Sequence, residues 1–228
     1  MYKLILDRMV GQHKLHNNVV IAAAGNLMGD RAIVNPISTA MQSRVIHIEM
    51  EINHKHWMED VAFVENYDSR IIAYLSQYPS KLMDFRPDHS EKTFACPRTW
   101  EFMNRLITDK PVSDEKAPLY AGTITSGIAV DFIQFTKVFG RLVTIRDILA
   151  DPDNCRLPMD MSERWATIAH IMEKIDGKNL DAISIYTSRF PLDFKVLFWR
   201  STLVRKPALR EHPAFSKAMI ELVRYLKD

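Results

Sequence analysis

Glycine is scarce in this sequence, and its scarcity limits the nucleotide sites that the chain can build. Seven glycines occur in 228 residues, less than half of the usual proportion of about 7%. None of them form the G-x-G-x-x-G pattern of dinucleotide-binding folds. Gly122 and Gly127 have the spacing of a phosphate loop, but Ile128 and Ala129 follow them in place of Lys and Ser/Thr. The 228 residues therefore contain no Walker A motif, and we interpret the glycine pair as a helix entry or a close helix contact.

Cysteines and long apolar runs are also few, and both observations limit the cellular compartments in which the protein is expected. Cys96 and Cys155 are the two cysteines, too few for a disulfide framework, so a reducing compartment is the expected setting. The longest apolar run, Val19–Ala24, is far shorter than the roughly 18 residues of a membrane span. The first residues mix charge into a short hydrophobic stretch and lack a small-residue cleavage site. The sequence predicts a cytoplasmic protein with no signal peptide and no membrane partner.

The chain has no excess of either charge. Thirty basic and 28 acidic residues give a net charge of +2, so there is no global signature of nucleic-acid binding. Basic residues do gather from Lys195 to the end of the chain, where Arg200, Arg205 and Arg210 are among them. A solvated helix face explains them most simply, and a helical nucleic-acid binder is the weaker alternative.

Helical periodicity dominates the rest of the sequence. Low glycine together with many Leu, Met, Ile, Lys and Arg residues favours a mainly helical chain. A first helical pattern covers residues 2–9, and Gly11 is its expected stop. Further patterns predict helices at about 54–66, 69–78, 97–108, 118–139, 162–175, 179–189, 191–204 and 213–227. Residues 84–95 and 109–118 are predicted loops.

An α/β segment precedes these helices. Val19–Ala24 is a continuous apolar run of the kind found in covered parallel strands, and Val45–Met50 is a second strand candidate. Pro36–Met41 between them is typical of a short helix that begins with proline. Two strands make a poor sheet by themselves. We therefore predict a mainly α protein in two parts, a partial α/β domain over residues 1–52 and a helical domain over residues 53–228.

Three polar side chains stand at positions where ligands bind. Asn26 follows the apolar strand, where open α/β sheets place ligands, although an asparagine there also stabilises a turn. Arg44 follows the short helix and could act as a transition-state cation, or only complement the helix dipole. Arg98 lies in the first turn of a helix, where a positive charge opposes the helix dipole and a bound anion would stabilise it. Simple solvent exposure is the alternative for Arg98.

Histidines and one cysteine give weaker signals. His13 and His16, and likewise His54 and His56, have spacings that suggest a metal, but no Cys or carboxylate stands at ligand spacing from them. Polar loop and first-turn histidines explain them, and we predict no metal site. Cys96 lies next to a helix start that could lower its pKa, although an incidental thiol is the simpler interpretation.

Several short stretches together resemble the second half of a MoxR-like AAA+ ATPase, in the subgroup found in bacterial and phage genomes. The matching stretches are Tyr2-Lys-Leu-Ile-Leu-Asp-Arg, Ala23-Ala-Gly-Asn26, Asp30-Arg-Ala, Asn35-Pro-Ile-Ser, Ser43-Arg44-Val-Ile-His-Ile and Pro97-Arg-Thr-Trp. The resemblance covers essentially the whole chain. Its most specific parts are residues 24–31 and 97–100.

The resemblance implies roles for four residues. Asn26 matches sensor 1, Arg44 the arginine finger and Arg98 sensor 2, while Arg31 is a second candidate for an arginine acting between subunits. ATP and Mg²⁺ are the cofactors of the intact family. A homo-oligomeric ring and a von Willebrand factor A-type partner protein are the assemblies that the resemblance implies.

The sequence also departs from the family pattern. The Walker A loop and the Walker B acidic pair would lie upstream of Met1, and nothing in the chain replaces them. Without the phosphate loop and the Mg²⁺ site, phosphoryl transfer loses its main electrostatic stabilisation. We therefore expect a truncated, carboxyl-terminal part of such an ATPase that is inactive alone. The alternative is a non-catalytic helical module, derived from such an ATPase, that binds another protein.

Overall fold

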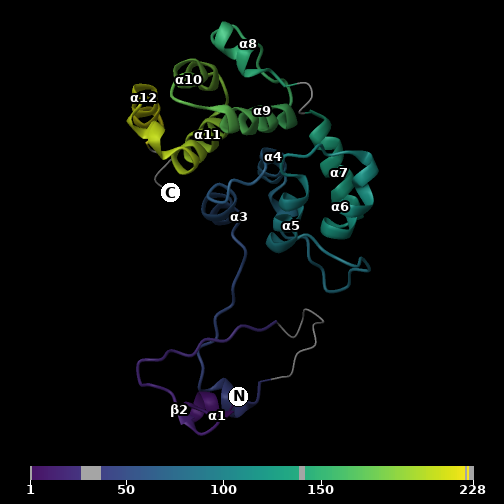
Figure 1. Ribbon diagram of the computed structural model, residues 1–228, viewed down its shortest axis with the longest axis vertical. Helices are drawn as coiled ribbons and strands as arrows, with labels where there is room; N and C mark the ends of the chain where they lie inside the picture. Colours follow the sequence, from purple (N-terminus) through teal and green to yellow (C-terminus); the bar gives the residue numbers. More distant parts are fainter. Residues whose placement is uncertain (1, 27–36, 139–141, 224, 226–228) are drawn as a thin grey trace. The chain divides into compact units, whose positions relative to one another are not determined.

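The computed structural model describes residues 2–26, 37–138, 142–223 and 225, and it divides the chain into two compact units. Unit 1 comprises residues 1–51 and 86–89, and unit 2 comprises residues 52–85 and 90–228. The predicted domain boundary after residue 52 lies next to this division. Figure 1 follows the chain through both units. The mainly helical class predicted from the sequence is confirmed.

Unit 1 has little regular structure among its described residues. Helix α1 spans Tyr2–Leu6, and the strands β1 (Met9–Val10) and β2 (His13–Lys14) form an antiparallel pair. Helix α2 spans Thr39–Gln42. Gly11 begins the two-residue turn between the strands with φ +62°, a conformation that glycine adopts without strain. The predicted helix over residues 2–9 is thus shorter, because the chain turns back into a hairpin before Gly11.

Neither of the two predicted strands of the α/β segment is a strand in the structure. The described residues of unit 1 have no regular backbone pairing at Val19–Ala24 or at Val45–Met50. Their apolar side chains lie in solvent: Val20 is 90% exposed and Ile46 is 89% exposed. A covered apolar strand needs neighbouring strands that pair with its backbone and helices that cover its faces, and the strand pair β1–β2 in the described part of unit 1 pairs with neither segment. These strand predictions are wrong for the chain as it stands.

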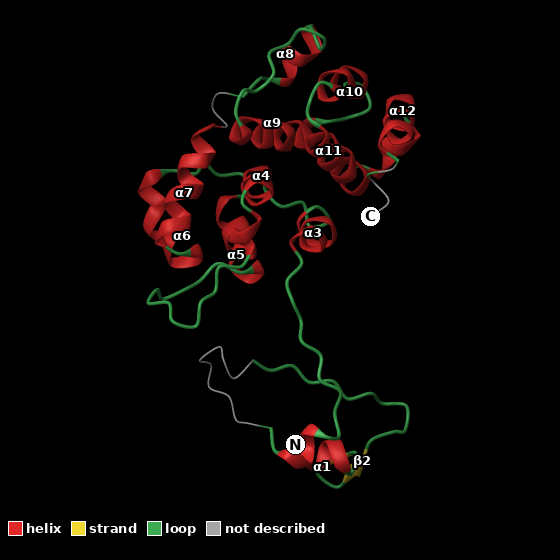
Figure 2. Cartoon of the chain, turned by 180° about the vertical axis from the view of Figure 1, so that it is seen from behind, coloured by secondary structure: helices red, strands yellow, loops and turns green. Residues whose placement is uncertain are grey.

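Unit 2 is helical throughout its ordered elements (Figure 2). Its α-helices are α3 (His54–Trp57), α4 (Ser69–Gln77), α5 (Pro97–Ile107), α6 (Ala117–Ile124), α7 (Ser126–Lys137), α8 (Ile145–Ala150), α9 (Met161–Lys174), α10 (Leu180–Ser188), α11 (Leu192–Arg205) and α12 (Pro213–Leu222). A π-helical turn, Met58–Ala62, continues α3. Short 3-10 turns cover Pro79–Leu82, Asp114–Lys116 and Pro207–Glu211.

Helix α4 lies at the centre of this unit. It packs against α9 and also contacts α7, and α11 packs against α9 as well (Figure 1). Ile71, Ile72 and Leu75 of α4 are completely buried. Because burying each such side chain stabilises a fold by about 1.5–3 kcal/mol, α4 contributes strongly to the stability of the helical unit.

Two details of the helices differ from the sequence prediction. The helix predicted over residues 118–139 is divided into α6 and α7 at Thr125, whose φ is +81° and ψ 157°. Helix α8 was not predicted, although Thr144 and Asp147 form a capping box at its start. Its six residues are too few for a periodic apolar pattern to be recognised.

Replacing Thr125 by glycine is expected to stabilise unit 2. The backbone at this position lies in a region that is populated almost only by glycine, and its strain costs about 1–3 kcal/mol. Glycine removes this strain. It also gives the unfolded chain more conformational freedom, which raises the free-energy cost of folding by up to about 1 kcal/mol. We expect a net gain of about 1 kcal/mol in the free energy of unfolding, measured by urea denaturation. Thr125→Ala keeps a Cβ and is the control that should show no gain.

In the part of the chain that the structure describes, every helix is too short or too polar to cross a lipid bilayer.

Candidate functional site

The first turn of α5 holds Arg98 in a well-defined setting. Cys96 precedes the helix, and its backbone N–H donates to the hydroxyl of Thr99 at 2.8 Å. Trp100 is fully buried, and its indole N–H donates to the carbonyl of Lys81 at 2.8 Å. Arg98 itself is exposed, and the turn contains no acidic residue. A capping box between Cys96 and Thr99 closes this turn, and the turn has no acidic residue, so an anion beside Arg98 would meet the guanidinium and the positive end of the helix dipole.

Arg44 has a local partner in unit 1. Its guanidinium Nη1 donates to the carbonyl of Ala40 in α2 at 2.5 Å. This is the contact expected of a cation at a helix C-terminus, the alternative that the sequence left open. The side chain is exposed. Its role as an arginine finger stays a prediction.

Asn26 and Arg31 were the other two predicted site residues. Asn26 is exposed in a segment without regular structure, directly after Gly25. Arg31 lies outside the described residues. Asn26 and Arg44 belong to unit 1 and Arg98 to unit 2, and each unit is described by itself. The convergence of these side chains on one nucleotide therefore stays a prediction.

Polar groups gather at a small cavity of unit 2 that the sequence did not indicate. Its volume is about 210 Å³, and its walls include Met58, Phe63 and Trp165. Glu59 on the π-helical turn accepts from Arg200 on α11 at 2.8 Å, so an ion pair closes one side. No local pattern indicates this ion pair, since the two residues are 141 positions apart in the sequence.

His54 lines the same cavity but is held in place by the backbone. Its Nε2–H donates to the carbonyl of Leu75 in α4 at 2.9 Å. Burial lowers the pKa of His54, and the hydrogen bond to Leu75 opposes this effect only in part. Within the described residues, no cluster of three or more His, Cys, Asp or Glu side chains has the geometry for a metal ion.

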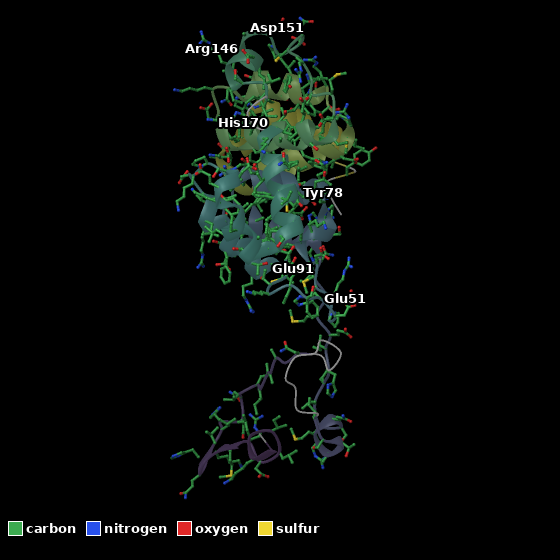
Figure 3. All side chains as sticks on the ribbon, turned by 90° about the vertical axis from the view of Figure 1, so that its right-hand side faces the viewer. Glu51, Tyr78, Glu91, Arg146, Asp151 and His170 are labelled. Atoms are coloured by element: carbon green, nitrogen blue, oxygen red, sulfur yellow. The ribbon has the colours of Figure 1, made fainter. Side chains whose placement is uncertain are left out.

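Lowering the pH is expected to destabilise unit 2 through two histidines. Burial lowers the pKa values of His54 and His170, the latter with help from Lys174, while Glu173 opposes the shift at His170 (Figure 3 labels His170). The unfolded histidines accept protons near pH 6.5, whereas the lowered pKa values in the folded unit move protonation to lower pH. The unfolded state then binds more protons, so stability falls as the pH drops below about 6.5.

The measurement is the urea midpoint between pH 7.5 and 5. The double variant His54→Gln/His170→Gln should show a smaller loss over this interval than the unmodified chain. His56→Gln provides a control for the substitution itself, because this side chain is exposed and its loss should change the urea midpoint at pH 7.5 little. An identical slope in the double variant would contradict the assignment.

The chain was compared with known proteins. No protein-family model matches it, and no curated protein or solved structure matches it either.

Proposed function

We propose that this chain is the carboxyl-terminal part of a MoxR-like AAA+ ATPase, a machine that couples ATP hydrolysis to the remodelling of a partner protein. The observation that carries the proposal is the first turn of α5. Arg98 is exposed there between the anchored residues Cys96 and Trp100, at a helix start without acidic neighbours. In the family that the sequence resembles, an arginine at this position reports the state of the nucleotide to the helical lid.

The electrostatics of this turn support a role in binding phosphate. A phosphate group next to Arg98 would gain from both the guanidinium charge and the positive end of the α5 dipole. Because Thr99 and Trp100 fix the turn, the guanidinium can bind an anion without first ordering the backbone. A change in the bound phosphate group would be transmitted through Arg98 to α5 and to the helices that α5 contacts.

The exposed apolar runs of unit 1 support the same proposal. Ile46, Ile48 and Met50 alternate with polar residues and are 89%, 81% and 91% exposed. Alternation of this kind suits a β-strand with one covered face. In a AAA+ sheet, neighbouring strands would pair with this segment and helices packed on the face of the sheet would cover these side chains.

The residues of this chain do not by themselves fit Mg-ATP. The sequence has no Walker A loop, and the described residues contain no cluster of metal-ligand side chains. The proposal therefore places the phosphate loop and the Mg²⁺ site in sequence outside these 228 residues. We expect no ATP hydrolysis by this chain alone. Assembly into a ring and a von Willebrand factor A-type partner rest on the resemblance only.

Calorimetric titration with Mg-ATP and with ADP tests the proposal. It compares this chain with a longer product of the same reading frame, each with and without Arg98→Ala. We expect binding by the longer product only, weakened at least about tenfold by Arg98→Ala. Arg105→Ala is the matched control, because Arg105 is also exposed on α5 and forms an ion pair with Glu101. Absence of binding by both chains, or equal effects of the two variants, would overturn the proposal.

A non-catalytic interaction module is the second candidate. The exposed side chains of Ile46, Ile48 and Met50 favour it, because apolar groups gathered on a surface mark sites of protein contact. The calorimetric titration separates the two candidates, because an interaction module is expected to bind neither Mg-ATP nor ADP, either as this chain or as the longer product.

A further inference from the structure

The segment Val45–Glu51, at the end of unit 1, has an unpaired backbone (Figure 3 labels Glu51). Within the described part of the chain, none of its backbone N–H and C=O groups forms a hydrogen bond, and the strand pair β1–β2 does not include it. It contains no glycine or proline, the residues that weaken or interrupt a strand. The backbone of the segment is therefore free to pair with another extended chain.

The side chains of this segment alternate between two kinds. In an extended chain Ile46, Ile48 and Met50 lie on one face, and all three are in solvent in this structure. His47 and Glu49 lie on the opposite face. One apolar and one polar face make a strand that fits a partner with the same alternation.

A second copy of the same segment is complementary when it runs antiparallel and the pair is centred on Ile48. Ile48 then faces Ile48 of the second copy, and Ile46 faces Met50. On the polar face His47 is opposite Glu49, and the two-fold symmetry of the pair repeats this contact. Cross-strand pairs of opposite charge and apolar pairs both stabilise a sheet.

Other registers are less favourable. A shift by one residue would place apolar side chains opposite polar ones. An antiparallel pair centred on Glu49 would oppose its two carboxylates, and a parallel in-register pair would oppose both Glu49 and Glu51 to themselves. Like charges directly opposite one another destabilise a strand pair. Among the antiparallel registers centred on residues 47, 48 and 49, the central one pairs histidine with glutamate and opposes no like groups.

We propose that two copies of this chain associate through Val45–Glu51, as an antiparallel strand pair centred on Ile48. A pair of short strands is marginally stable by itself, so the dimer is weak and reversible. The proposal deepens the second candidate function, the interaction module, because it names a second copy as the partner of the exposed apolar segment. It concerns the 228-residue chain, since in the longer product of the first candidate this segment lies within a sheet.

Sedimentation equilibrium over a range of concentrations up to roughly 1 mM tests the association. Ile48→Lys places two lysines opposite each other and should weaken the dimer at least about tenfold. Val20→Lys is the matched control: Val20 is also exposed in unit 1 but lies outside the segment, and its replacement should leave the association unchanged. Both side chains are in solvent, so neither variant is expected to disturb the fold of the single chain.

Reversal of the polar pair tests the register. His47→Glu places two carboxylates opposite each other at both ends of the pair and should weaken the dimer roughly threefold to tenfold. The double variant His47→Glu/Glu49→Lys again opposes unlike charges and should restore it. This rescue is expected in the register centred on Ile48, whereas in the register centred on residue 49 the two new lysines would face each other.

Cysteine cross-linking measures the same register directly. Ile48→Cys should form a disulfide-linked dimer under mild oxidation, because opposite Cβ atoms lie about 4.5–5.5 Å apart. Ile46→Cys alone should not, since its two copies lie about 14 Å apart along the strands, but a mixture with Met50→Cys should cross-link. The unmodified chain, with free Cys96 and Cys155, gives the background.

Three results would overturn the proposal: an unmodified chain that stays monomeric over the whole concentration range, equal effects of Ile48→Lys and Val20→Lys, or cross-linking of Ile46→Cys alone as efficient as that of Ile48→Cys. Nucleotide binding by the longer product is measured separately. A monomeric 228-residue chain would therefore leave the ATPase proposal unaffected, and a dimer would not by itself support it.

Discussion

Replacing Trp100 by alanine is expected to lower the free energy of unfolding of unit 2 by about 4 kcal/mol. The side chain is completely buried, and its ring centroid lies 5.7 Å from that of Tyr74 and 5.8 Å from that of Phe132. Alanine leaves a cavity among these rings and removes the hydrogen bond from the indole to the carbonyl of Lys81. The loss should appear as a lower urea midpoint in far-UV circular dichroism.

Two further variants separate the causes of this loss. Trp100→Phe keeps most of the aromatic volume and leaves the carbonyl of Lys81 without its donor, which should cost about 1–3 kcal/mol. Phe102→Ala is the control on the same helix, because Phe102 is 45% exposed and should contribute less than about 1 kcal/mol. Since Trp100 anchors the turn of Arg98, its loss should also impair the proposed anion site at Arg98. A loss below 1 kcal/mol in Trp100→Ala would show that α5 does not depend on this contact.

The helices of unit 2 could be predicted because their signals are local. In α5, Pro97 marks the start, and Trp100, Met103 and Ile107 recur at helical spacing and are all buried. The break at Thr125 has no such signal. A β-branched residue does not favour positive φ, so tertiary contacts impose this conformation and the local sequence does not indicate it.

The strands of unit 1 could not be predicted in the same way. Val45–Met50 has a partly alternating pattern, yet a strand is stable only where a neighbouring strand pairs with it. The sequence of the segment carries no information on whether that neighbour is present. The described residues of unit 1 contain none for it, and the apolar side chains remain in solvent.

The candidate sites show the same limit. Arg98 was predicted at a helix start and lies there, because a proline and a periodic apolar pattern fix the helix locally. The cavity between Glu59, Arg200 and Trp165 was missed, because these residues are far apart in the sequence and meet only through the contacts of α11 with α9 and with the π-helical turn.

Arg70 joins the N-terminus of α4 to the C-terminus of α5, and removing it is the second change with a large expected effect. Its Nε and Nη2 donate to the two carboxylate oxygens of Asp68 at 2.8 and 2.6 Å. Its Nη2 and Nη1 also donate to the carbonyls of Ile107 and Lys110 at 2.8 and 3.0 Å. The side chains of Arg70 and Asp68 are 18% and 9% exposed, so the pair is largely removed from water.

Arg70→Met is expected to lower the free energy of unfolding by about 3 kcal/mol, because the largely buried carboxylate of Asp68 loses its cation and keeps only the backbone N–H of residue 70, while the carbonyls of Ile107 and Lys110 lose the guanidinium. Arg70→Lys keeps the charge but cannot bridge both groups, so it should recover only part of this loss. Arg105→Met is the matched control. Its ion pair with Glu101 is mostly in solvent, and such pairs contribute about 0–1 kcal/mol. If the two methionine variants were equally stable, the Arg70 bridge would be no more than a surface ion pair, and the packing of α4 on its neighbours would alone hold the unit together.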